Sequence, residues 1–207
     1  MKTRDRILEA SLRLFNEEGA TKVSTNHIAT ELEISPGNLY YHFKSKEQII
    51  DWLFRRFESR IDPLINNKEN IQALDDWWLS IHLSLEVVCE YRFLFRDLDF
   101  LVREFPSFAT RVRKLTLRRL QGARRQCGDL ADAGVLQATN EDLELLALHI
   151  VFTETCWLTF ANLLTDGRRT QPQSGLAAYH VFTLLGPYLA DEESRHYLNY
   201  LRSKYLT

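Results

Sequence analysis

Apolar residues in this chain recur at the spacing of an α-helix along most of its length. The first such pattern, with the i, i+3, i+4, i+7, i+8 spacing of one helix face, consists of Ile7, Ala10, Ser11, Leu14 and Phe15. Gly19 stands where that helix would end. No stretch of useful length has the two-residue alternation of a strand. The sequence therefore predicts an all-α protein, and 207 residues that are 45% hydrophobic are enough to bury a core.

Capping signals place three further helices in the first third of the chain. Ser24 or Thr25 can cap a second helix, and Ser35 caps a third with Pro36 at its first position, where the missing N–H of proline costs nothing. We expect the third helix to end at Phe43. A capping box at residues 45–48 then starts a fourth helix, which runs towards Pro63.

The short third helix carries more polar and aromatic side chains than its own packing can use. At 100° per residue, Leu39 and Phe43 share one face, and Gly37, Asn38 and Tyr41 occupy the other. An asparagine can recognise base edges, and tyrosine hydroxyls and lysines can hold phosphates. This pattern predicts a helix that enters a groove of DNA; a solvated helix packed on a neighbouring domain is the alternative.

The stretch IATELEISPGNLYYHFKSKEQII, residues 28–50, resembles the helix-turn-helix of the TetR family of bacterial transcription regulators. The resemblance covers the first quarter of the chain closely, and the all-helical remainder fits the ligand-binding and dimerisation domain of that family more loosely. It implies a three-helix DNA-binding domain at residues 1–48 and a larger helical effector-binding and dimerisation domain at residues 49–207. It also implies a repressor that binds a palindromic operator on double-stranded DNA as a homodimer.

The resemblance assigns DNA contacts residue by residue. The predicted DNA-binding set is Thr25, Asn26, Ser35, Pro36, Gly37, Asn38, Tyr40, Tyr41, His42, Lys44 and Lys46. One position departs from the family, because the turn commonly carries glycine where this chain has Glu33. A non-glycine residue in a left-handed conformation costs about 1–2 kcal/mol, so the turn is expected to be strained or differently shaped.

The last long helices are predicted to form the dimer surface. Residues 170–190 carry no formal charge, and beyond the acidic start of the preceding helix Glu154 is the only charge as far as Thr165. Helices that are apolar on two sides need two partners, and large exposed apolar patches mark interfaces. A deeply buried pair of core helices in a monomer is the alternative.

An aromatic-rich interior in the second part of the chain suggests a site for a small hydrophobic effector, although a plain packed core has the same composition. The predicted ligand-binding residues are Trp78, His82, Leu85, Phe108, Thr153 and Trp157. His82, His149 and Glu154 are the candidate polar anchors, with hydrogen-bonded core histidines as the simpler interpretation.

A basic stripe adds one specific hypothesis about the effector. Arg111, Lys114, Arg118 and Arg125 fall on one side of a predicted helix. A solvated face, a sequence-independent contact with DNA phosphates and a specific anion site all fit it. The segment YRFLFRDLDFLVREFP, residues 91–106, is similar to one in TetR-family members linked to fatty-acid and polyhydroxyalkanoate metabolism, which implies a fatty acyl-coenzyme A effector with its phosphates on these arginines.

Other classes of protein find less support in the sequence. We find no nucleophile arrangement, phosphate loop, paired carboxylates or metal-ligand spacing, so we expect no enzymatic activity, no cofactor and no metal. No signal peptide and no run of 20 uncharged apolar residues is visible, which predicts a cytoplasmic protein that does not bind a membrane. An all-helical protein-interaction module without an effector remains the alternative function.

Overall fold

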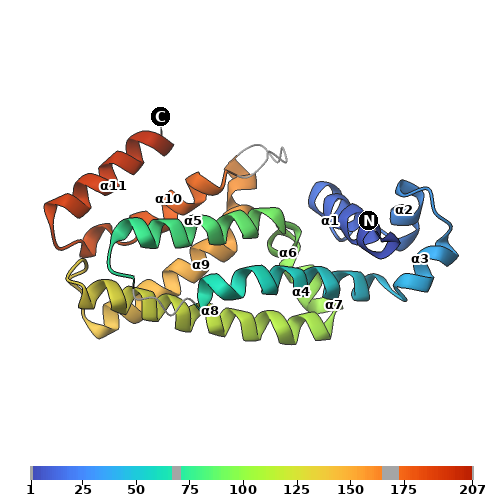
Figure 1. The fold of residues 1–207 in the computed structure, drawn as a ribbon, viewed down its shortest axis with the longest axis horizontal. Coiled ribbons are helices and arrows are strands. Elements are labelled where there is room, and N and C mark those ends of the chain that lie inside the picture. The colour runs from blue at the N-terminus through green and yellow to red at the C-terminus, as the bar shows by residue number, and fades with distance from the viewer. Residues whose placement is uncertain (1, 67–70, 165–172, 207) are drawn as a thin grey trace. The chain divides into compact units, whose positions relative to one another are not determined.

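The computed structural model describes residues 2–66, 71–164 and 173–206, and these residues form helices (Figure 1). The α-helices are α1 (Thr3–Glu18), α2 (Thr25–Glu31), α3 (Pro36–His42), α4 (Lys46–Ile65), α5 (Leu74–Glu90), α6 (Phe93–Arg96), α7 (Leu98–Glu104), α8 (Pro106–Asp132), α9 (Asn140–Leu164), α10 (Ser174–Thr183) and α11 (Glu192–Tyr205), with a 3₁₀ turn at Gly186–Tyr188. The described part of the chain contains no strand, only an isolated bridge between Leu136 and Leu189. The all-α prediction is confirmed.

The chain divides into two compact units. Unit 1 consists of Met1–Arg60 and Tyr91–Arg113, and unit 2 consists of Ile61–Glu90 and Lys114–Thr207. The borders between the units fall within α4 and α8. The predicted domain boundary after residue 48 falls near the start of α4 and stays a prediction.

Unit 1 joins the first three helices to a segment from much later in the chain. The apolar face of α1 is buried as expected, and the ring of Phe15 lies 5.2 Å from that of Phe93 in α6. The Asn16 side chain accepts a hydrogen bond from the backbone N–H of Phe93 at 3.0 Å. On α4, the Phe57 ring lies 5.7 Å from Tyr91 and 5.6 Å from Phe95. Residues 91–113 are therefore part of the core that holds the N-terminal helices.

In unit 2, α10 lies against α5, α9 and α11 (Figure 1). Its apolar residues 177–179, 181 and 182 are buried, and the Phe182 ring lies 5.5 Å from both Trp77 and Trp78 of α5. The uncharged segment thus contributes much of its apolar surface to the core of the unit.

Prolines and glycines lie near the ends of α4, α8 and α10. α4 continues through Pro63 to Ile65, because a proline in the last turn removes only one hydrogen bond from a helix of 20 residues. The proline at position 106 favours a break between helices, and α7 ends at Glu104 while α8 starts at Pro106. The glycines at positions 167 and 175 also favour a break, but most of residues 167–175 lie outside the described part of the chain, and Gly175 itself is within α10.

Candidate functional site

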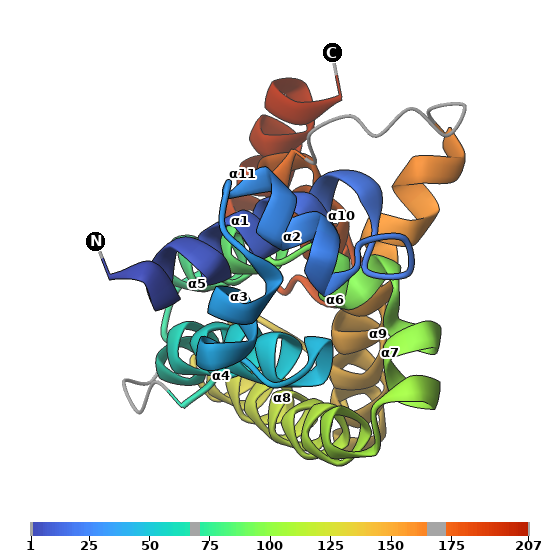
Figure 2. The ribbon, with the colours of Figure 1, turned by 90° about the vertical axis from the view of Figure 1, so that its right-hand side faces the viewer.

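Helices α2 and α3 (Figure 2) each begin with a side-chain cap. The Ser24 hydroxyl accepts from the backbone N–H of His27 at 3.1 Å, and the Ser35 hydroxyl accepts from that of Asn38 at 3.2 Å. Both predicted caps are confirmed. Glu33 has a φ of 54°, so it occupies the left-handed region that glycine would adopt without strain. Of the two predicted outcomes, a strained turn and a differently shaped one, the structure shows the strained turn, at a cost of about 1–2 kcal/mol.

Helix α3 separates its anchors from its exposed residues as predicted. Leu39 and Phe43 are fully buried, whereas Gly37 and Asn38 are exposed and Tyr41 is 78% exposed. A tyrosine ring and an asparagine amide side by side on an outward face can contact both phosphates and base edges. The geometry therefore presents a narrow polar and aromatic ridge rather than a packing surface.

The remaining predicted contact residues surround this ridge. The Tyr40 hydroxyl lies 3.1 Å from the Thr25 hydroxyl, which links α3 to the start of α2. Asn26, Ser35 and Pro36 are exposed, and half-buried His42 lies edge-on to Tyr41 with ring centroids 5.1 Å apart. The structure thus brings α2 and α3 together as one surface of unit 1.

The two predicted lysines differ. Lys44 is exposed, and its backbone N–H donates to the Gln48 side chain at 2.8 Å. The Ser45 hydroxyl accepts from the Gln48 backbone N–H at 3.2 Å, so Ser45 caps α4 as predicted, with the return bond one residue earlier than in a standard capping box. The Lys46 ammonium group instead donates to the backbone carbonyl of Ala20 within unit 1. Burial lowers the pKa of Lys46, and the nearby Asp97 carboxylate opposes that shift. The Ala20 carbonyl uses one of the three N–H donors of Lys46 and holds its ammonium group close to unit 1, whereas exposed Lys44 can reach outward, so Lys44 is the better candidate for a phosphate contact.

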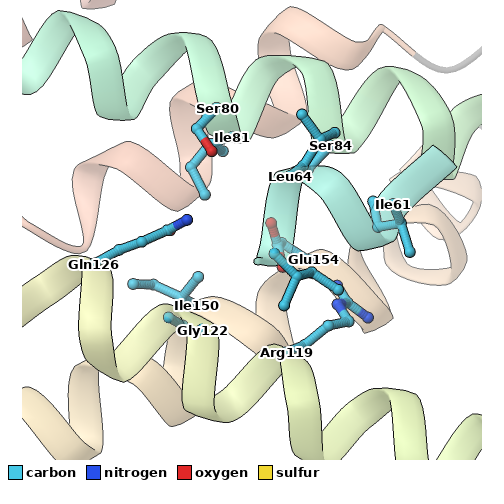
Figure 3. A pocket seen from close by; sticks show the side chains of 12 residues that line it. Ile61, Leu64, Ser80, Ile81, Ser84, Arg119, Gly122, Gln126, Ile150 and Glu154 are labelled. Atoms are coloured by element: carbon cyan, nitrogen blue, oxygen red, sulfur yellow. The ribbon is translucent and has the colours of Figure 1, made fainter. Parts of the chain in front are cut away.

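Unit 2 contains a small cavity between α4, α5, α8 and α9 (Figure 3). Its volume is about 30 Å³, which is room for about one water molecule. The apolar walls come mainly from Ile61, Leu64, Ile65, Ile81 and Ile150. The polar lining comes from Ser80, Ser84, Arg119, Gln126 and Glu154.

The six predicted ligand-binding residues do not meet at this cavity, because none of them lines it. Phe108 belongs to unit 1, where its ring packs on Phe54, and the other five belong to unit 2. Trp78 stacks on His82, Trp157 lies 4.2 Å from the His180 ring, Leu85 is buried and Thr153 is half-buried. These aromatic residues act as packing in this structure. Of the candidate anchors only Glu154 reaches the cavity, and His149 is exposed.

Sequence reasoning missed Arg119 and Gln126. Both lie on the buried side of α8, in register with Leu115, Ala123 and Leu130. Two polar residues seven positions apart on an otherwise apolar helix face would have indicated them, because buried polar side chains need partners.

The basic stripe of α8 is largely engaged within the chain. In unit 1, Arg111 pairs with Asp51 and Glu58. In unit 2, the Arg118 guanidinium lies 3.1 Å from the Asp62 carboxylate, and Arg125 donates to the Ile65 carbonyl at 2.6 Å. Lys114 is exposed. An anion could bind at Arg118 and Arg125 only in competition with these partners.

Comparison with known proteins gives two family matches. Residues 7–52 match the family described as bacterial regulatory proteins, tetR family, and residues 56–197 match the TetR family described as a bacterial transcriptional repressor. The second match alone covers more than half of the chain. The protein belongs to the TetR family.

Individual relatives agree with this assignment. A crystal structure of a TetR-family transcriptional regulator from Marinobacter aquaeolei VT8 is 37% identical, covers 99% of both chains and has a TM-score of 0.87. The repressor KstR2 of Mycolicibacterium smegmatis is 33% identical over 34% of this chain and only 38% of its own length. The SmeT–triclosan complex, at 18% identity and a TM-score of 0.62 over 92% of this chain and 93% of its own, shares the fold.

In this TetR-family chain, α9 leaves a wide apolar stripe uncovered. Each of its members is more than half exposed, and they are Leu145, Leu148, Phe152, Phe160, Leu163 and Leu164. By length and composition alone α9 could cross a membrane, but core helices of soluble proteins have the same properties. Its opposite side is buried in unit 2 and carries Glu154, paired with Arg119 at 2.8 Å. The stripe is therefore an uncovered face of a packed helix.

Proposed function

We propose that this protein is a transcriptional repressor that binds a palindromic operator as a homodimer and responds to a small hydrophobic effector. The observation that carries the proposal is the division of α3, with Leu39 and Phe43 buried and Asn38 and Tyr41 exposed. A helix anchored on one side and polar on the other is suited to the major groove. Members of the TetR family are transcription factors rather than enzymes, so the enzyme alternative is dropped.

The proposed DNA contacts come from residues 1–48. Asn38 and Tyr41 would contact base edges and Lys44 a phosphate, with Thr25 and Tyr40 holding α2 and α3 in register. So short a helix reaches only a few base pairs. Two copies in successive major grooves, about 34–36 Å apart or a multiple of that, would supply the remaining specificity.

The apolar stripe of α9 is the proposed dimer surface. A twofold interface uses the same patch on both copies, and a continuous helix face of large apolar residues can pack against its own copy. The sequence predicted that both of the last long helices form the dimer surface, and the proposal now assigns it to α9. Much of the apolar face of α10 is already buried inside unit 2.

The effector is proposed to bind in unit 2, where the cavity of about 30 Å³ would be the closed form of its site. The SmeT–triclosan complex supports this proposal, because it is a protein of the same fold with a small molecule bound. A fatty acyl-coenzyme A is the more specific form of the proposal. Its phosphates would have to compete with Asp62 for Arg118 and with the Ile65 carbonyl for Arg125.

Selection of bound sequences from random DNA tests the proposal. We expect an inverted repeat, bound with an affinity that falls steeply with salt while the preference for the repeat is retained. Tyr41→Ala should weaken binding to the selected repeat, and Tyr200→Ala, the same change at an exposed tyrosine of unit 2, is the matched control. Selected sequences without a shared repeat would favour the protein-interaction module instead.

A further inference from the structure

Gln126 differs from the other buried polar residues of the protein. The described residues include six of these, namely Ser11, Asn16, Arg119, Gln126, Glu154 and Ser194. Five of them have hydrogen-bond partners in the chain. The Gln126 residue is only 7% exposed, and its amide makes no hydrogen bond within the described part of the chain. The amide atoms are reached from the cavity rather than sealed in the core, so this position suits a bound water or ligand.

The Gln126 amide is directed into the cavity of unit 2. Figure 3 shows it extending from α8 towards Ile81, with the Ser80 hydroxyl on the facing helix. An amide offers both a donor and an acceptor, and a hydroxyl offers the same. This end of the cavity is therefore equipped to bind a neutral polar group.

The charged side chains at the other end of the cavity are already paired with each other. Arg119 donates to the Glu154 carboxylate at 2.8 Å and to the Thr155 hydroxyl at 3.2 Å, and the side chains of the ion pair are 7% and 8% exposed. An anionic ligand would have to displace Glu154 from Arg119, and a cationic one would have to displace Arg119 from Glu154. Either exchange leaves one buried charge without its partner.

The walls between these two ends are aliphatic. They are formed by isoleucine, leucine and alanine side chains and by Gly122, where an added Cβ would lie 2.9 Å from an Ile65 methyl group. Helices α4 and α8 therefore approach closely at Gly122. A cavity of about 30 Å³ holds about one water molecule, so any larger ligand has to displace these walls to enter. Walls of this composition favour an aliphatic body over a charged one.

We propose that the effector of this protein is a small neutral molecule with an aliphatic body and one hydroxyl, carbonyl or amide group, and that Gln126 binds that group. Only the regulatory role of this ligand rests on the proposed function, because binding itself can be measured without DNA. It assigns Gln126 as the residue that selects for ligand chemistry. It also disfavours an acyl-coenzyme A, which brings several negative charges.

Three probes of equal chain length test the ligand class. The full chain is titrated calorimetrically with 1-hexanol, hexanoate and hexylammonium, and hexanoyl-coenzyme A is added as a fourth arm. We expect 1-hexanol to bind at least about tenfold more tightly than either ion, because a charge in this cavity loses its hydration without gaining a free counter-charge. Equal affinities, tighter binding of an ion or of the coenzyme A ester, or no binding of 1-hexanol would overturn the proposal.

Substitution of Gln126 tests the residue. Gln126→Leu should weaken 1-hexanol at least about tenfold, and the unliganded protein should melt no lower than the unmodified one, because the variant loses an unpaired buried amide. Gln126→Met serves the same purpose if the leucine does not fold. Gln121→Leu, an exposed glutamine on the same helix, is the control and should leave binding unchanged. Full 1-hexanol affinity in the Gln126 variants would exclude the assignment.

Operator affinity, measured separately, distinguishes this inference from the function on which it rests. If 1-hexanol binds through Gln126 but leaves operator affinity unchanged, the ligand class is supported and the effector role is wrong. If operator binding is absent altogether, the repressor proposal fails, while the calorimetric result still decides the ligand class.

Discussion

Phe152 lies near the middle of the exposed stripe of α9, and its removal should break the proposed dimer. The side chain is 63% exposed. A phenylalanine has about 200 Å² of surface, so about 130 Å² would be buried at a twofold interface, worth about 3 kcal/mol at ~25 cal/mol per Å². Alanine keeps part of this area, which leaves a loss of about 2 kcal/mol per copy. Both copies contribute in a symmetric dimer, so Phe152→Ala should raise the dimer Kd about a thousandfold.

Sedimentation velocity over a range of protein concentrations measures that Kd directly. Leu117→Ala is the matched control, because Leu117 is also an exposed apolar residue of unit 2, at 52%, but lies on α8 outside the stripe. It should leave the association unchanged. A Phe152→Ala protein with an unchanged Kd, or a Leu117→Ala protein that dissociates, would refute the assignment of the interface to α9.

Three further predictions concern single side chains. Asn38→Ala should reduce operator affinity by about 1–3 kcal/mol and relax the preference at one base pair of each half-site, as read from single-base variants of the operator. Lys44→Ala should weaken all sequences about equally and reduce the salt slope by about one unit per protomer, whereas Lys46→Ala should reduce it less, because the Ala20 carbonyl holds the Lys46 ammonium group close to unit 1; a larger loss of slope for Lys46→Ala would reverse the assignment of the two lysines. Glu154→Ala should lower the free energy of unfolding in urea by about 3–5 kcal/mol because it leaves the Arg119 charge buried and alone, while replacing both residues by Met and Leu should cost far less; equal losses in the two proteins would show that the ion pair is not the cause.

The part of the fold that the sequence predicted well depends on signals a few residues apart. Ser35 and Pro36 define the start of α3 by themselves, and the 100° step between residues is enough to bury Leu39 and expose Tyr41. The unusual backbone at Glu33 was also expected, from a single departure in the turn. These features need no knowledge of the rest of the chain.

The part that the sequence did not predict depends on partners distant in the chain. The residues close to Arg118 in the sequence do not indicate its pairing with Asp62, which lies 56 residues earlier. The Arg118 side chain was therefore predicted to be available for an anion. The bond from Lys46 to the Ala20 carbonyl was not predicted for the same reason, because that carbonyl precedes Lys46 by 26 residues; the phosphate contact of Lys46 stays a prediction. The cavity was missed because aromatic composition pointed to Trp78 and Trp157, whose rings are used in packing.

The two-segment construction of unit 1 limits how such a regulator can exchange parts with its relatives. A recombination event that transferred only residues 1–60 would separate Phe57 from Tyr91 and Phe95, and would separate Asn16 from the backbone of Phe93. The new protein would then present its recognition helix on a core built from mismatched halves. We expect functional hybrids to inherit residues 91–113 together with the N-terminal helices. Operator specificity and this internal segment should therefore be inherited together, although the 30 residues 61–90 of unit 2 separate them in the chain.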